Sequence, residues 1–269
     1  MTTELELVIA KESHSQKSYK KDCYFTAPLK IGEPKSENDR LHIVCMMASA
    51  GILKGDEFSY KIICEKDTKV LITEQSYNKL FDMGNSGKSF RHMDISVERN
   101  ASLWYRPCAV VPFRNSCFSS TADIRVEDGA ELLWTDIFTA GRVGMGEKFA
   151  FRHYDNCIKV WYGERLVWID KCILDPSHFD MENIFYYRNY THQGTCYYCG
   201  NYEKERRLLN TDFSKIQYEH IYIGMTQAKK GVCIRVLGNQ SQDIEELFDH
   251  VNDIIKGVIP LEEVSNSII

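Results

Sequence analysis

The pattern that most constrains this chain is an alternation of apolar and polar residues at every second position. Such alternation predicts β-strands with one buried face, because an amphipathic helix repeats roughly every 3.6 residues instead. The alternating segments come in pairs separated by short turn sequences. They cover residues 58–64 and 70–74, 93–97 and 101–105, 122–126 and 131–134, and 157–162 and 166–169. The chain is therefore expected to be mainly β.

The turns between these paired segments lie near residues 67, 100, 129 and 163. Their spacing of about 30 residues indicates stacked strand pairs. Asp128-Gly129 is the strongest signal among them for a two-residue hairpin, because both residues tolerate positive φ. An antiparallel meander of hairpins and the coils of a β-solenoid both fit this spacing, and the pattern alone does not separate them.

The last third of the chain predicts two more strands, over residues 218–223 and 232–236. An amphipathic helix is expected over 242–256, with Ser241 as its N-cap and Gly257 at its C-terminal end. The charged residues 200–215 predict a loop or a short helix. No change in composition marks a linker, so residues 1–269 are expected to form a single domain.

Charge and cysteine content exclude several classes of protein. The formal net charge is −5, from 33 Lys+Arg and 38 Asp+Glu. The chain therefore lacks the excess of basic residues that is typical of a general nucleic-acid-binding protein. No apolar run approaches the ~20 residues that a membrane-spanning helix needs. The N-terminus carries Glu4 and Glu6, unlike a secretory signal. The 10 cysteines are therefore expected to be reduced thiols in a cytoplasmic protein.

One short segment has metal-ligand spacing. His192, Cys196 and Cys199 could hold a borderline ion such as Zn²⁺, which would make the chain a small zinc-binding metalloenzyme. The alternative is that these are loop cysteines without a metal, since no second close pair of cysteines supplies further ligands. No sequence signature of a catalytic serine or of a helical zinc protease is present, so no catalytic residue is assigned.

A stretch in the middle of the chain resembles a known family. Gly141-Arg142-Val-Gly-Met-Gly146-Glu147-Lys-Phe149 is similar to the G-R-x-x-x-G-E-x-F signature of the urease accessory protein UreD, also called UreH. Further segments resemble the family in the same order along the chain, over roughly residues 20–260. They include the glycine-rich segment 50–56, the strand 70–79, the stretches around Pro112 and Asp175, and the closing strand and helix.

This resemblance implies a fold and a function. The fold would be mainly β, with strands stacked in a helical, solenoid-like arrangement and a couple of α-helices, including a C-terminal amphipathic helix. The protein would not be an enzyme. It would join UreF and the GTPase UreG in a heteromeric complex, or a dimer of such complexes, that docks on the urease apoprotein and delivers nickel. The final helix and the tail at 260–269 could contact UreF, although a disordered tail fits the sequence equally well.

The resemblance also selects candidate site residues. No tightly bound cofactor is expected, only transient Ni²⁺, which carboxylates and hydroxyls hold more loosely than thiolates do. A nickel passage is therefore hypothesised along six residues in or beside the matched segments: Asp56, Glu57, Ser76, Asp136, Glu147 and Asp170. Gly55, Gly141, Arg142 and Gly146 are expected to shape the turns. The alternative is that Asp56, Arg142 and Glu147 only stabilise those turns.

Overall fold

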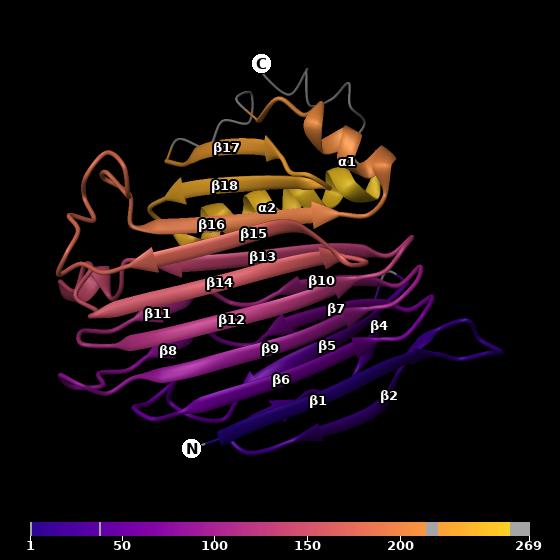
Figure 1. Ribbon diagram of the computed structural model, residues 1–269, viewed down its shortest axis with the longest axis horizontal. Helices are drawn as coiled ribbons and strands as arrows, with labels where there is room; N and C mark the ends of the chain where they lie inside the picture. The colour runs from indigo at the N-terminus through magenta and orange to yellow at the C-terminus, as the bar shows by residue number, and fades with distance from the viewer. Residues whose placement is uncertain (1, 38, 214–219, 259–269) are drawn as a thin grey trace.

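The computed structural model describes residues 2–37, 39–213 and 220–258. It consists of two stacked β-sheets, here called the front sheet and the back sheet, with two α-helices beside the back sheet (Figure 1). The front sheet contains, in spatial order, β15 (Arg165–Leu174), β14 (His153–Tyr162), β12 (Cys117–Val126), β9 (Ser89–Val97), β6 (Glu57–Cys64), β1 (Thr2–Lys11) and β2 (Ser18–Phe25).

The back sheet follows the same direction of stacking. Its main path is β17 (Tyr222–Gln227), β18 (Val232–Gly238), β16 (His192–Cys199), β13 (Glu131–Thr139), β10 (Ser102–Arg106), β7 (Lys69–Glu74), β5 (Arg40–Met47) and β3 (Leu29–Ile31). Short strands β4 (Lys35–Glu37), β8 (Asn78–Leu80) and β11 (Val110–Pro112) join it at the side. The expected mainly-β, solenoid-like fold is confirmed.

The turns near 67, 100 and 129 each carry the chain from the front sheet to the back sheet. Strands β6, β9 and β12 therefore pair in parallel with one another, and β7, β10 and β13 do the same behind them. The hairpin predicted at Asp128-Gly129 is wrong, because β12 and β13 lie in different sheets. A two-residue hairpin occurs at Gly163 instead, where β14 and β15 pair antiparallel with Tyr162 opposite Arg165.

These sheet-crossing turns stack on one another. Asp67, Asn100 and Gly129 occupy equivalent positions and all have positive φ, between 58° and 73°. The Asn100 side-chain amide donates a hydrogen bond to the Asp67 carboxylate over 3.1 Å, which connects two successive turns. Positive φ is as useful in such a turn as in a hairpin, which explains why the local sequence signal misled the prediction.

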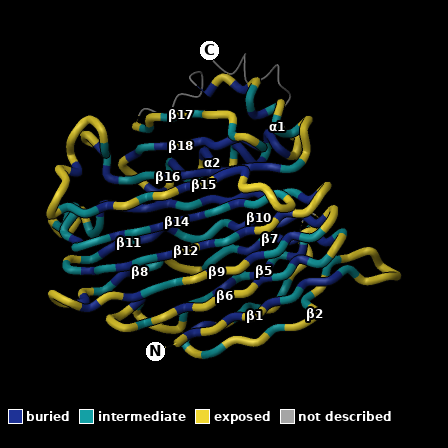
Figure 2. Tube along the Cα trace, viewed as in Figure 1, coloured by how far each residue is buried: buried dark blue, intermediate teal, exposed yellow. Residues whose placement is uncertain are grey.

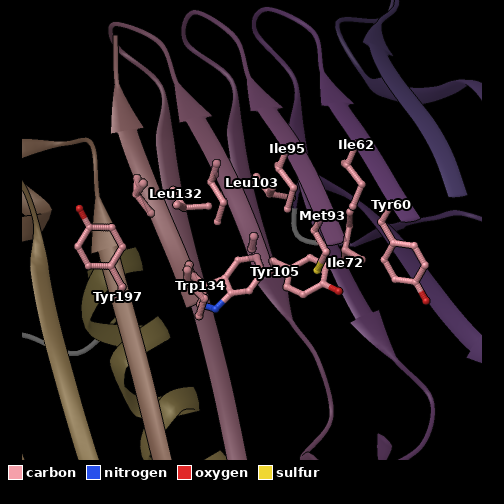
Figure 3. Packing of buried hydrophobic residues seen from close by; sticks show 14 of the residues in the cluster. Tyr60, Ile62, Ile72, Met93, Ile95, Leu103, Tyr105, Leu132, Trp134 and Tyr197 are labelled. Carbon is pink, nitrogen blue, oxygen red and sulfur yellow. The ribbon is translucent and has the colours of Figure 1, made fainter. Parts of the chain in front are cut away.

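The core fills the space between the two sheets. Inward side chains from successive coils form ladders, as Figure 3 shows for Leu103 and Leu132 and for Tyr105 and Trp134. The rings of Tyr105 and Trp134 stack with centroids 4.6 Å apart. Each fully buried apolar side chain contributes about 1.5–3 kcal/mol, so these ladders are the main stabilisation of the solenoid. Burial alternates along the strands in the same way (Figure 2).

The predicted helix is α2 (Ser241–Lys256), which packs on the outer face of the back sheet. Its N-cap is Gln240 rather than Ser241, and no side chain caps it, so that part of the prediction is wrong. Gly257 ends the helix at φ 73°, as expected. Residues 200–215 contain a second helix, α1 (Tyr202–Leu209).

Two further expectations fall partly or wholly outside the described residues. The strand predicted over 218–223 begins at Tyr222, and residues 218 and 219 are not among those described. The tail at 260–269, considered as a contact for UreF, lies wholly outside them.

Candidate functional site

Two rows of polar residues face each other inside the sandwich. On the front sheet, strand pairing places Arg91, Ser120, Asn156 and Cys172 side by side across four neighbouring strands. On the back sheet, Cys45 pairs with Glu74, and Asp136, Thr195 and Arg235 pair in turn. Ile72, Tyr105 and Trp134 are aligned with one another, so Glu74 and Asp136, each two residues further along, lie at the same level. The four residues of the front row and the five of the back row, together with Asp170, are called the polar layer below.

Direct contacts connect the polar layer across the interior. Asn156 of the front sheet donates to the Asp136 carboxylate of the back sheet over 2.8 Å. Arg235 of the back sheet donates to Asp170 of the front sheet over 2.7 Å. Adjacent strands lie about 4.8 Å apart, so Glu74 and Asp136, two strands apart, are separated by roughly 10 Å, as are Asp136 and Arg235.

Burial changes the proton affinities in this layer. It raises the pKa of Asp136 to about 6, and the nearby Asp170 charge adds to that rise while Arg91 opposes it. Burial likewise raises the pKa of Glu74, again against the Arg91 charge. Burial alone would lower the pKa of Arg91, but Tyr105 and Glu74 outweigh it. One arginine therefore serves as the counter-charge for two carboxylates.

The interior around Asp136 has unused hydrogen-bonding capacity. The buried hydroxyls of Tyr154 and Tyr187, both close enough to Asp136 to interact electrostatically, have no hydrogen-bond partner among the described residues. Buried polar atoms without a protein partner usually bind ordered water. The polar layer therefore suits a hydrated ion better than an apolar ligand.

A cavity opens at the Glu74 end of the polar layer. It has a volume of about 150 Å³ and is lined by Cys45, Tyr60, Glu74 and Ser76, among others. At the other end the Arg235 side chain is 49% exposed, while the bound Asp170 side chain is 9% exposed. The layer thus reaches the surface region at both ends. Of the six hypothesised passage residues, Ser76, Asp136 and Asp170 belong to this arrangement.

Glu147 lies elsewhere, in the turn that follows β13. The Arg142 guanidinium donates two hydrogen bonds to the Glu147 carboxylate, of 2.9 Å and 2.7 Å. These hydrogen bonds lower the pKa of Glu147. The Arg142 guanidinium also lies 4.1 Å from the centre of the Phe113 ring.

Gly141, at φ 119°, leaves no space for a side chain, because a Cβ would lie 2.8 Å from the Glu147 and Pro112 carbonyl oxygens. Gly146, at φ 75°, ends the short 3₁₀ helix η1 (Val143–Met145).

Asp56 and Glu57 also lie apart from the polar layer. The Asp56 carboxylate accepts a hydrogen bond from the Leu53 amide over 2.8 Å, in a turn that contains Gly55 at φ 80°. Glu57 is exposed on the outer side of β6, since its neighbour Phe58 points into the core. Asp56 thus contributes to a turn, and Glu57 faces solvent.

The structure does not bring His192, Cys196 and Cys199 together. All three lie on strand β16, where residues three apart point to opposite faces. Cys196 packs toward α2 and Cys199 packs between the sheets. His192 lies four residues from Cys196, roughly 13 Å along an extended strand. One ion cannot contact all three, and the described residues contain no group of three or more metal-ligating side chains.

Burial also shifts the proton affinities of these three residues of β16. Burial raises the pKa of both the Cys196 and the Cys199 thiol to about 12, so both are protonated at neutral pH. Burial also lowers the pKa of His192 to about 4. All ten cysteines are free thiols.

The amino-acid sequence matches the UreD urease accessory protein family over residues 1–265. A urease accessory protein UreD from Acetivibrio thermocellus is 30% identical over 255 residues, which span 94% of this chain and 97% of the relative. The chain belongs to the UreD family. A UreH from Helicobacter hepaticus is 32% identical over 221 residues, or 82% of this chain and 86% of the relative. Family membership confirms the resemblance and supports a role in urease maturation.

Within this UreD-family chain, sequence reasoning missed Glu74 and Arg91. The sequence did contain a signal for both residues. Glu74 lies on the same face of its strand as Val70 and Ile72, and Arg91 lies on the same face as Met93 and Ile95. A charged residue that continues the buried face of a strand points into the core.

No helix among the described residues is long and apolar enough to cross a membrane.

Proposed function

We propose that this UreD-family chain is a non-catalytic scaffold that helps deliver nickel to urease in the cytoplasm. It would act in a complex with UreF and the GTPase UreG that docks on the urease apoprotein, and Ni²⁺ would be a transient cargo. Family membership supports the urease part of this proposal. The polar layer supports the nickel part, because it places carboxylate, amide and hydroxyl groups of two facing sheets inside an otherwise apolar core.

The chemistry of the polar layer suits passage rather than storage. An ion moves through a protein only if each site is attractive enough to enter and weak enough to leave. Carboxylate, hydroxyl and water oxygens bind Ni²⁺ less tightly than thiolate or imidazole clusters do. Glu74, Asp136 and Asp170 supply the carboxylates, spaced so that only one or two reach an ion at a time. Arg91 and Arg235 further weaken each site by competing for the carboxylates.

The cavity beside Ser76 is the proposed entrance or exit at one end. Ser76 is exposed and Glu74 lies behind it, so an ion entering there would meet a hydroxyl before a carboxylate. At the far end, the ion would pass the Asp170–Arg235 pair. Asp56, Glu57 and Glu147 are left out of this route because they lie at turns or on the outer face.

The test is the nickel content of urease matured with variant chains, measured by mass spectrometry on purified urease. Glu74→Gln and Asp136→Asn keep the side-chain shapes but remove the negative charge. We expect each to lower the nickel content severalfold while the complex with UreF, UreG and apo-urease still co-purifies. Glu57→Gln removes an exposed carboxylate on the outer face and should leave loading unchanged.

Two outcomes would contradict the proposal. Normal nickel loading with both interior variants would exclude the polar layer as the route. Failure of the wild-type chain to co-purify with UreF-like and UreG-like partners would contradict the scaffold role itself.

A further inference from the structure

A groove lies on the opposite side of the back sheet from the polar layer. Two adjoining cavities, of about 270 Å³ and about 340 Å³, share Arg40, Trp104 and Lys256 in their linings. Trp104 comes from β10 and points away from the core, since its neighbours Leu103 and Tyr105 point inward. The combined space, here called the Trp104 groove, runs beside the C-terminal end of α2.

The charges that line this groove are unevenly paired. Its acidic side chains mostly have other basic partners: Asp39 with Lys69, Glu131 with Lys204 at 2.8 Å, Asp249 with Arg106 at 2.6 Å and Glu37 with His42 at 2.9 Å. Among the ion pairs of the described residues, Lys256 takes part only in a long contact of 3.9 Å with Asp253. Arg40 forms no ion pair with any described residue; its hydrogen bonds go to the Ser102 hydroxyl and carbonyl.

Arg40 is held in place although it forms no ion pair with a described residue. Its guanidinium lies 3.8 Å from the centre of the Trp104 ring, and the Lys256 ammonium lies 5.4 Å from the same centre. Burial lowers the pKa of Arg40, and the nearby Asp39 and Glu131 charges, which act to raise it, do not cancel that effect. An arginine fork that is fixed and partly desolvated is well prepared to bind an anion with two parallel hydrogen bonds.

A second, independent observation comes from the tryptophan. Trp104 is only 3% exposed, and its indole N–H has no hydrogen-bond partner among the described residues. Buried donors are normally satisfied by protein, water or ligand. A residue that lines the groove therefore carries an unused buried donor, and Arg40 and Lys256 lie over the ring of that same residue.

We propose that the Trp104 groove binds an oxyanion, a phosphate or carboxylate group, between Arg40 and Lys256. The four cations of the larger cavity outnumber its two carboxylates, so an anion entering there is attracted rather than repelled. Such a group could belong to a free small molecule or to the acidic side chain of a partner protein. The site does not depend on nickel passage, because the back sheet separates it from the polar layer.

The test is titration calorimetry on the full chain with inorganic phosphate, and in parallel with a capped hexaglutamate peptide. Saturable one-to-one binding is expected, weakening as NaCl is added. Arg40→Gln should lower the affinity about tenfold, because a charge-assisted pair of hydrogen bonds is lost. Arg40→Lys keeps the charge but not the fork and should recover only part of that loss. Lys256→Gln should weaken binding by a smaller factor.

Lys61→Gln is the matched control, since Lys61 is an exposed lysine on the outer face of the front sheet. It should change the affinity less than twofold. Thermal melting of each variant separates loss of the site from loss of the fold. Tighter binding of phosphate than of the peptide, with both dependent on Arg40, assigns the site to a free anion, and the reverse order assigns it to a partner's carboxylate. Absence of saturable binding of either probe, or binding that Arg40→Gln and Lys256→Gln leave unchanged, overturns the proposal.

Discussion

Asp136 gives the sharpest stability prediction. Its pKa is about 6 in the folded protein, against an ordinary value of 3.8. The folded state therefore binds this proton more tightly than the unfolded chain does. The resulting stabilisation is fully present below about pH 3.8 and is lost as the pH rises through about 6. At pH 8 the charged carboxylate lowers the free energy of unfolding by about 3 kcal/mol relative to a neutral side chain.

Asp136→Asn removes this charge and keeps an oxygen that can accept the hydrogen bond from Asn156. We expect the variant to be more stable than the wild type by about 3 kcal/mol at pH 8. At pH 5, part-way between the two pKa values, the same linkage relation leaves a gain of about 1.5 kcal/mol. The two free energies of unfolding are measured by urea denaturation at each pH, with the extrapolation to water.

The pH dependence is the decisive observation, because a change in packing alone would not follow the titration of one carboxylate. Glu6→Gln is the control: Glu6 is exposed on the outer face of β1, so its substitution should have little effect at either pH. A gain for Asp136→Asn that is the same at pH 5 and pH 8, or a loss at pH 8, would falsify the reasoning.

Three other outcomes are expected from the same structure. Gly141→Ala should destabilise the protein by about 2 kcal/mol or more in denaturant unfolding, because its Cβ would overlap two carbonyl oxygens, whereas Gly144→Ala, with open space around it, should be nearly neutral. Glu147→Gln should lower the free energy of unfolding by about 1 kcal/mol at pH 7 and by progressively less as the pH falls. The pKa of Glu147 is lowered in the folded protein, so the stabilisation by its carboxylate is lost when the carboxylate is protonated. Equal effects at pH 7 and pH 3 would contradict this. Cys199→Ser should lower the melting temperature without changing the zinc content of the purified protein, and stoichiometric zinc in the wild type that disappears in the variant would restore the metal-site hypothesis.

Most strands from β6 onward could be predicted from local sequence, but their pairing could not, and β1, β2, β5 and β16 were not predicted as strands. Alternation identified the buried face of β6, β9 and β12 because the side chains of a strand point to opposite faces in turn. The Asp128-Gly129 turn was misassigned because a residue with positive φ permits both a hairpin and a crossing between sheets. Only the packing of neighbouring coils, with Asn100 fastened to Asp67, selects the crossing.

The candidate site was predicted in part, for a similar reason. Asp136 and Asp170 were selected because they lie in segments that resemble the UreD family, and the structure places both in the polar layer. Glu147 and Glu57 were selected on the same ground and lie elsewhere. Membership of a matched segment does not indicate which way a side chain points, and the partners of Glu74 and Arg91 come from strands far apart in the chain.

The sequence by itself determined that the chain is mainly β, that a helix closes it and which faces of its strands are buried, since these depend on intervals of a few residues. The tertiary structure decided which strands pair, how polar positions from distant coils align into one layer and why the β16 cysteines face opposite ways. Those features depend on register between strands, and register is fixed by the packing of the whole sandwich rather than by neighbours in the chain.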